Sequence, residues 1–465
     1  MPVPPRRFHL VTLGCPKNAV DSEKMAAALA RDGVEPTDDV GAADLVVLNT
    51  CAFIEAAREE SVGVALELAA ARRPGARLVV TGCMAERYGA ELADALPEAD
   101  AVVGFAGEAT LASDVLGLAT PVGMPRRKPS GVADLLDLPR RAPAHPWAYL
   151  KVAEGCDRAC AFCAIPTFRG RQVSRSLDAI VDEATALVEG GVSELVLVAQ
   201  DVAWYGRDLD GTPRLADVMG RLDALAPAGL ARQRLLYLYP SEVKGPLLDA
   251  VLDLPTAVPY FDFSLQHASA SLLRRMKRWG SGERFRSLVD EIRARRPDAA
   301  FRSSFIVGFP GETEDDHDEL LAFLEGAELD WAGFFPFSRE DDTAAASMEG
   351  APPPDVVGDR IRELQELQDR ITAGHRHALV GTTVEVFVDE WLADDLAAGG
   401  RPDGPEGAVA IGRTHREAPE IDGVVYLHGD VVVRPGVVVE ARVTGVAGPD
   451  LQAEAVAVPA AVGAG

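Results

Sequence analysis

The chain has 465 residues, 48% hydrophobic and 25% charged, a composition typical of folded proteins and not of disordered or fibrous ones. Its net charge of −26 disfavours the phosphate backbone of nucleic acid and favours a basic protein partner, although general solubility explains the acidity equally well. The N-terminus lacks the apolar segment of a signal peptide, and no apolar run reaches membrane-spanning length. We expect a multidomain cytoplasmic protein that does not contact a membrane.

The first 105 residues alternate apolar runs with helical stretches, which predicts a parallel α/β sheet. The runs FHLVTLGC, ADLVVLNTC and RLVVTGC each end in a cysteine: Cys15, Cys51 and Cys83, here called the N-terminal triad. All three should lie at the carboxyl edge of the sheet, where open α/β sheets bind ligands. We assign residues 1–120 to this domain and the proline-rich residues 121–144 to a linker.

Residues 145–375 contain six apolar runs that alternate with helical segments, which predicts a partial (β/α)6 barrel. The runs are AYLKV, ELVLVAQ, RLLYLY, FDFSL, FRSSFIVGF and AGFFPF. Reacting groups of such barrels lie in the loops after the strands. Short β-like runs separated by Gly, Pro and Asp follow over residues 376–458 and predict a small antiparallel β-barrel. Residues 459–465 form a tail.

Six cysteines in a chain without a signal peptide are expected to bind a group, since the cytosol keeps thiols reduced. Cys156, Cys160 and Cys163, here called the central triad, lie in one loop after the first barrel strand. Three thiolates can hold three corners of a 4Fe-4S cluster and leave the fourth iron open. A structural zinc ion is the alternative, but it usually takes four protein ligands.

This C-x3-C-x2-C spacing resembles the signature of the radical S-adenosylmethionine (SAM) superfamily. The resemblance implies that the open iron binds SAM and that an electron from the cluster cleaves it to a 5'-deoxyadenosyl radical. The segments LGCPKNAVDSEK, LNTCAFIEAAREES and TGCMAER resemble those of the methylthiotransferase family, and the likeness covers nearly the whole chain. It implies that the N-terminal triad holds a second 4Fe-4S cluster, which can carry the sulfur or methylthio group. The alternative is that these three cysteines are small buried apolar residues without a ligand role.

Other family motifs imply a set of cofactor-binding residues. The QD pair, the SLQHASASLLRRMKR segment, and Arg302 with the run IVGFPGET at the end of the fifth strand are all expected around SAM, where glycine lets the backbone approach a ligand closely. The RGxxxSR pattern supplies an arginine for a carboxylate. The simpler alternative for the RGxxxSR pattern is a solvated basic loop, and for the histidine of SLQHASASLLRRMKR it is a core histidine. The residues are Gln200, Asp201, Arg175, Gln266, His267, Arg302, Ile306 and Gly308. The loop FSREDDTAAASM departs from the family form, in which glycine often precedes the threonine.

The family divides mainly into members that modify an adenosine of transfer RNA and members that modify an aspartate of the twelfth small-subunit ribosomal protein. LGCPKN, VDSE and NTCAFIE resemble the ribosomal-protein type, whereas the RNA type usually has GCQMN. Residues 380–465 resemble a TRAM module, but five arginines, no lysine and fourteen acidic residues give them a net charge of −9, which disfavours RNA. Transfer RNA remains the alternative substrate, and a non-catalytic electron-carrying cluster protein is the alternative class.

The resemblance also implies a reaction and its partners. One SAM methylates sulfur held at the N-terminal triad, and a second SAM supplies the radical. The radical removes hydrogen from the β-carbon of the target aspartate, which then captures the methylthio group. We expect a reductase-type protein to donate the electron.

Overall fold

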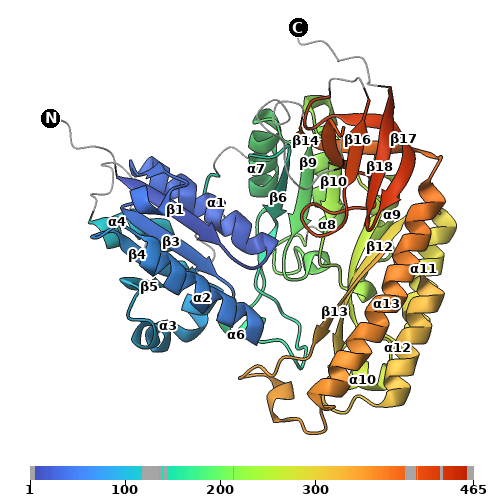
Figure 1. The fold of residues 1–465 in the computed structure, drawn as a ribbon, viewed down its shortest axis with the longest axis horizontal. Coiled ribbons are helices and arrows are strands. Elements are labelled where there is room, and N and C mark those ends of the chain that lie inside the picture. Colours follow the sequence, from blue (N-terminus) through green and yellow to red (C-terminus); the bar gives the residue numbers. More distant parts are fainter. Residues whose placement is uncertain are drawn as a thin grey trace.

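The structure is a computed structural model that describes residues 6–117, 136, 138–140, 144–212, 214–392, 405, 407–429 and 433–457. Three units follow one another along the chain: an α/β sheet domain, a barrel of parallel strands and a small closed β-barrel (Figure 1). Most of the expected linker and all of the expected tail lie outside the described residues. No helix in the described part of the chain is both long and apolar enough to cross a membrane.

The N-terminal domain is a fully parallel five-stranded sheet with strand order β2-β1-β3-β4-β5. The strands are β1 (Arg7–Thr12), β2 (Glu35–Pro36), β3 (Leu45–Thr50), β4 (Arg77–Gly82) and β5 (Ala101–Val103). The helices are α1 (Pro16–Arg31), α2 (Glu55–Ala71), α3 (Cys83–Ala95) and α4 (Leu111–Leu116), with short 3-10 turns η1 (Val40–Ala42) and η2 (Phe105–Thr110). Every residue of β3 is buried, as expected for a central strand that helices cover on both faces.

The central domain contains the six predicted parallel strands. They form two three-stranded sheets, β10-β9-β6 and β11-β12-β13, which two isolated parallel bridges join between β10 and β11. The strands are β6 (Trp147–Lys151), β9 (Glu194–Val198), β10 (Arg232–Leu235), β11 (Tyr260–Gln266), β12 (Ala300–Val307) and β13 (Trp331–Pro336). The third strand ends before the predicted run RLLYLY does, since Tyr237 adopts a positive φ of 65°.

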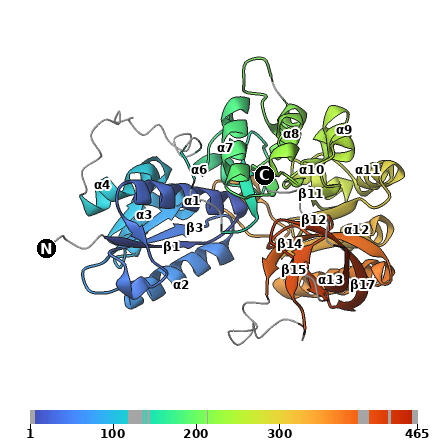
Figure 2. The ribbon, with the colours of Figure 1, turned by 90° about the horizontal axis from the view of Figure 1, so that it is seen from above.

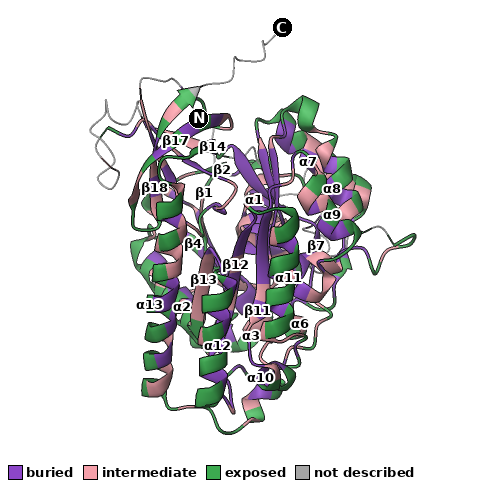
Figure 3. Cartoon of the chain, turned by 90° about the vertical axis from the view of Figure 1, so that its right-hand side faces the viewer, coloured by how far each residue is buried: buried purple, intermediate pink, exposed green. Residues whose placement is uncertain are grey.

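Helices cover the outside of the barrel and expose their outer faces, while β11 and β12 are largely buried behind them (Figure 3). The helices are α6 (Ile165–Phe168), α7 (Leu177–Glu189), α8 (Leu215–Asp223), α9 (Pro246–Asp253), α10 (Ala270–Arg275), α11 (Gly282–Arg295), α12 (Glu314–Ala327) and α13 (Pro354–Leu379). The 3-10 turns are η3 (Val202–Trp204), η4 (Ala226–Ala228), η5 (Pro240–Glu242) and η6 (Ala344–Ser347), and a small hairpin pairs β7 (Ala153–Glu154) with β8 (Val173–Ser174).

The C-terminal unit is a closed barrel with strand order β14-β15-β16-β18-β17. The strands are β14 (Thr383–Trp391), β15 (Ala410–Arg413), β16 (Val425–His428), β17 (Val438–Ala447) and β18 (Asp450–Ala457). The prediction of an antiparallel barrel needs one correction, because β16 and β18 pair in parallel. The helix α13 continues to Leu379, so the boundary expected between residues 375 and 376 falls within it.

The segment after β15 covers the amino ends of the central strands. Arg234 in β10 donates to the His415 carbonyl at 2.9 Å, and the Trp331 indole in β13 donates to the Arg416 carbonyl at 2.7 Å. The Tyr260 hydroxyl in β11 donates to Asp422 at 2.6 Å. The C-terminal barrel therefore lies at the opposite end of the strands from the cysteine loop, as Figure 1 also shows.

The N-terminal domain lies beside the central barrel, with α1 turned toward β6 and α7 (Figure 2). The loop FSREDDTAAASM, which departs from the family form, joins the two domains. Its Glu340 is buried and binds Arg58 in α2 and Arg87 in α3. The Ala345 amide of the same loop donates to the Ala161 carbonyl of the cysteine loop at 2.8 Å. This loop thus links the N-terminal domain to the central triad.

Candidate functional site

The N-terminal triad lies at the carboxyl edge of its sheet. Cys15 caps the first turn of α1 after β1, Cys51 follows β3, and Cys83 begins α3 after β4. The three strands are neighbours, so the cysteines converge. Gly14 illustrates how closely they approach, because a Cβ atom there would lie only 3.2 Å from the Cys51 sulfur.

The three thiols of this triad differ in their electrostatic surroundings. Burial raises the pKa of Cys83 to about 12 and also raises the pKa of Cys51. Burial acts the same way on Cys15, but Lys17, Arg169 and backbone N–H groups outweigh it and lower the pKa of that thiol. Negative charge on the other thiols opposes ionisation of Cys51 and Cys83, so a bound cation would favour their thiolate forms.

The central triad occupies the loop after β6 and β7. The Arg158 amide donates to the Cys156 sulfur at 3.4 Å, and Arg278 donates to the Cys160 sulfur at 3.5 Å. Burial raises the pKa of Cys156 to about 11 and that of Cys163 to about 12, and charge on the neighbouring thiols adds to both shifts. The loop thus gathers three thiols that repel one another when ionised.

The residues present fit an iron-sulfur group. No three His, Cys, Asp or Glu side chains of the described residues converge closely enough to hold a single metal ion. A 4Fe-4S cluster binds each thiolate to a different iron, so its ligands need not meet at one point. Gln200 Oε1 and Asp201 Oδ1 are buried near the central triad without a described hydrogen-bond partner. Both oxygens can therefore accept a hydrogen bond from a bound molecule.

The QD pair lies at the carboxyl end of β9, at the strand end that the sequence predicts. Asp201 accepts from Arg158 Nε at 2.7 Å, and Arg158 also stacks 3.7 Å from the centre of the Tyr239 ring. Gln200 donates to Glu154, which belongs to the small hairpin beside the cysteine loop. The pair therefore borders the central triad.

Gln266 is the last residue of β11, and His267 follows it. Gln266 has a positive φ of 72° where the register with β12 shifts. His267 is fully buried, accepts from the Ser269 amide at 3.0 Å and leaves Nε2 without a described partner. Burial lowers its pKa to about 4, so it is neutral at pH 7.

The position expected for Arg302, at the end of the fifth strand, is wrong. Arg302 is the third residue of β12, and its guanidinium binds Asp262 at 2.9 Å and Asp422 at 3.3 Å. The apolar run FRSSFIVGF begins at Phe301, so it already placed Arg302 near the start of the strand, and grouping Arg302 with IVGFPGET was the error. Arg302 thus joins β11 to the C-terminal unit.

Gly308 in the run IVGFPGET packs closely against a helix. Gly308 has a positive φ of 83°, and a Cβ atom there would lie 2.5 Å from Val357 of α13. Close packing against the helix therefore favours glycine here, and the close approach to a ligand that the sequence suggests stays a prediction. The preceding Ile306 is half-buried in β12 and pairs with Phe335 in β13.

Arg175 is buried and faces protein groups. It donates to the Lys151 carbonyl at 3.0 Å and pairs with Glu183 of α7 at 2.7 Å. Its own backbone amide donates to the Val152 carbonyl at 3.0 Å. Arg175 therefore joins the end of β6 to α7.

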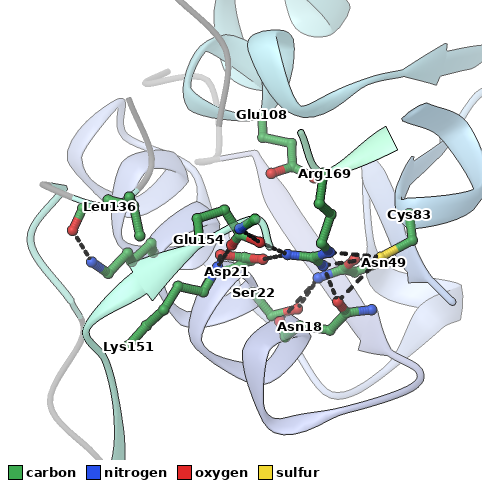
Figure 4. A network of polar contacts seen from close by, with 12 residues as sticks. Asn18, Asp21, Ser22, Asn49, Cys83, Glu108, Leu136, Lys151, Glu154 and Arg169 are labelled. Carbon is green, nitrogen blue, oxygen red and sulfur yellow. Dashed lines mark hydrogen bonds and ion pairs between the residues drawn. The ribbon is translucent and has the colours of Figure 1, made fainter. Parts of the chain in front are cut away.

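Sequence reasoning missed a buried polar network between the two domains (Figure 4). Lys151 Nζ lies 2.5 Å from both Asp21 of α1 and Glu154, and Arg169 donates to Glu154 at 2.7 Å. Arg169 also donates to the Cys83 sulfur. Charged residues within the apolar stretch AYLKVAEG were the available signal for two of these groups.

Three family models match the chain. The Uncharacterized protein family UPF0004 matches residues 7–104, the Radical SAM superfamily matches residues 150–324, and the TRAM domain matches residues 380–456. These ranges correspond to the three units of the fold.

Curated relatives match over nearly the full length. "Ribosomal protein uS12 methylthiotransferase RimO" of Kineococcus radiotolerans is 40% identical, with 97% of each chain covered. The relative of the same name from Saccharopolyspora erythraea is 42% identical, with 96% of this chain and 94% of the relative covered.

A solved structure shares the fold. The radical S-adenosylmethionine methyltransferase TsrM of Kitasatospora setae, solved with cobalamin and a 4Fe-4S cluster, aligns with a TM-score of 0.53 at 17% identity. The alignment covers 73% of this chain and 74% of TsrM.

Proposed function

Since the chain belongs to the RimO family of ribosomal protein uS12 methylthiotransferases, we propose that it transfers a methylthio group to the β-carbon of an aspartate in uS12. The enzyme is a radical SAM methylthiotransferase that uses two 4Fe-4S clusters and SAM. The observation that carries the proposal is the full-length match to these relatives together with two cysteine triads at the carboxyl ends of two parallel sheets.

We assign one cluster to each triad. Cys156, Cys160 and Cys163 would hold the cluster that binds SAM, and Cys15, Cys51 and Cys83 would hold the cluster that carries sulfur. When bound, the first cluster and SAM supply the radical that removes hydrogen from an unactivated carbon.

The residues expected to bind SAM divide into two sets. Gln200 and Asp201 border the central triad and have oxygens without described partners, so we propose that they contact the cofactor. Gln266 and Ile306 lie toward the carboxyl ends of β11 and β12 and would line its pocket.

The remaining expected residues have other partners in the structure. Arg175 and Arg302 pair with carboxylates, His267 accepts from a backbone amide, and Gly308 packs against α13. Their effect on SAM would act through the shape and support of its pocket.

Charge supports a protein substrate. The net charge of −26 for the whole chain and −9 for residues 380–465 would repel RNA phosphates and attract a basic ribosomal protein. We place the reaction in the cytoplasm, where a reductase-type protein would donate the electron. Transfer RNA adenosine is the less favoured substrate.

The test is anaerobic reconstitution with iron and sulfide, followed by reductant, SAM and both candidate substrates. Mass spectrometry should find a methylthio-sized gain on an aspartate of uS12 and no gain on unmodified transfer RNA. A gain on adenosine alone would overturn the substrate assignment. SAM cleavage without either product would contradict both substrate assignments but would still support the assignment to the radical SAM class.

A further inference from the structure

Arg169 crosses the boundary between two domains to reach a cysteine. It follows α6 in the central domain, is almost completely buried and donates to the Cys83 sulfur from Nε at 3.2 Å and from Nη2 at 3.0 Å. Cys83 begins α3 of the N-terminal domain. One sulfur of the N-terminal triad thus accepts a forked hydrogen bond from the other domain (Figure 4).

The rest of the guanidinium is also held in place. Nη1 donates to Glu154 at 2.7 Å, and Nη2 donates to Asn18 Oδ1 at 2.7 Å. Asn18 is itself fixed, since its amide nitrogen donates to the carbonyls of Leu13 and Thr50. The planar guanidinium group of Arg169 has hydrogen-bond partners on each side, so it cannot rotate away from the sulfur without losing several hydrogen bonds.

The surrounding charges compensate one another. Lys151 lies between Asp21 and Glu154, and Arg169 pairs with Glu154 at 2.7 Å and with Asp21 at 3.7 Å. Two cations therefore face two carboxylates. Arg169 thus offers Cys83 directed hydrogen bonds within a group whose formal charges balance.

We propose that Arg169 is a positioning residue of the N-terminal triad, which fixes the Cys83 sulfur across the domain boundary and raises the reduction potential of the cluster held there. The inference rests on the cluster assignment proposed above. Hydrogen bonds to a ligand sulfur stabilise the negative charge that one-electron reduction adds to an iron-sulfur cluster. Without them the reduced state is less favourable, and the potential falls.

The test uses the full chain with Cys156, Cys160 and Cys163 replaced by alanine, so that only the N-terminal triad can bind a cluster. Reconstituted protein is titrated with dithionite and followed by electron paramagnetic resonance. Arg169→Lys keeps the charge but loses the paired hydrogen bonds from Nε and Nη2 to the sulfur. The midpoint potential of its cluster should be more negative than that of the parent.

Arg140→Lys is the matched control. Arg140 has a side chain only 2% exposed and also crosses the domain boundary, where it binds Glu23 of α1 and Glu183 of α7. Its described partners are oxygen atoms and not sulfur. An unchanged potential in Arg169→Lys, or an equal shift in Arg140→Lys, overturns the inference.

A second measurement does not depend on how a variant folds. The alanine-substituted parent is labelled with nitrogen-15 arginine, and the hyperfine spectrum of its reduced cluster is recorded. Coupling to arginine nitrogen supports the proposed hydrogen bonds, and its absence overturns them. A parent with no iron-sulfur signal at all would instead refute the cluster assignment, together with the inference that rests on it.

Discussion

At the scale of single residues, each cysteine triad has a sulfur that accepts hydrogen bonds from an arginine distant in the sequence. Arg169 reaches Cys83 across 86 positions, and Arg278 reaches Cys160 across 118 positions. Burial raises the pKa of the Cys83 thiol, and the adjacent Arg169 guanidinium offsets part of that shift. In both triads one sulfur thus faces an arginine that only the tertiary structure brings near it.

The two triads should fail differently when a cysteine is removed. Cys160→Ala should reduce both 5'-deoxyadenosine and methylthiolated uS12 to background, because the central triad is assigned to SAM cleavage. Cys51→Ala should retain SAM cleavage but lose methylthiolation. Chromatography of the nucleoside and mass spectrometry of uS12 measure the two products. Equal loss of both activities in both variants would contradict the assigned division of labour.

His267 should make stability depend on pH. Burial lowers its folded pKa to about 4, below the ordinary value of 6.5, so the unfolded chain takes up a proton first as pH falls. The stabilising contribution is complete above about pH 6.5 and is lost progressively toward pH 4. The unmodified protein should lose about 2 kcal/mol more than His267→Gln between pH 7.5 and pH 5.

Urea unfolding at the two pH values measures this difference. Asp316, His317 and Arg360 face the same histidine and remain in both proteins, so their contribution cancels to first order. Identical pH dependence in the two proteins would mean that His267 does not titrate as its burial requires.

At the scale of secondary structure elements, the end of β4 positions Cys83. Gly82 has a positive φ of 89°, and a Cβ atom there would lie 2.2 Å from Asn49 Oδ1 and 2.7 Å from the Thr50 backbone. The neighbouring strand β3 supplies these atoms, so they cannot move without disturbing the sheet. The junction of β4 and α3 therefore requires glycine.

Gly82→Ala should destabilise the protein and deplete iron at the N-terminal triad. An alanine there costs about 1–3 kcal/mol for a backbone conformation, φ 89° and ψ −159°, that is nearly restricted to glycine, and roughly 1–3 kcal/mol more for the clash. Gly75→Ala is the matched control, because Gly75 has a φ of 85° but a Cβ atom there would meet nothing within 4 Å. Thermal unfolding and iron content in the chain without the central triad measure both effects. Equal losses in the two variants would rule out the crowding explanation.

At the scale of the whole molecule, buried ion pairs join the C-terminal unit to the central barrel. Arg413 of β15 binds Glu194 of β9 at 2.6 Å and Asp389 of β14 at 2.7 Å, and both Arg413 and Glu194 are at most 2% exposed. Burial raises the pKa of Glu194, but Arg413, Arg234 and Arg232 outweigh it and lower that pKa to about 2. This contact holds one domain against another.

Arg413→Met should cost about 3–5 kcal/mol, because it removes the cation that Asp389 and Glu194 share and leaves Glu194 with Arg234 alone. Urea unfolding and the rate of proteolytic release of the C-terminal unit measure the loss. Arg442→Met, at an exposed arginine of β17, should change either quantity little. Comparable loss in both variants would contradict a specific role for the buried pair.

Patterns local to the sequence predicted much of this fold. Alternation of apolar and helical segments identified the parallel sheet, the six barrel strands and the C-terminal barrel. The same patterns put Arg302 near the start of the fifth run, so the expectation at the strand's end came from grouping it with the motif IVGFPGET and not from the run itself. The patterns missed the parallel pairing of β16 and β18, because pairing depends on how distant strands come together.

The positions of the cysteines at strand ends and the acidic character of the chain follow from the order and chemistry of neighbouring residues alone. The meeting of Arg169 with Cys83, of Lys151 with Asp21 and of Glu340 with Arg87 depends on packing between domains. Such pairs are far apart in the sequence, so no local periodicity constrains them. Burying a charge without a partner costs free energy, so the charged groups buried between the domains pair with the opposite charges that the fold places beside them.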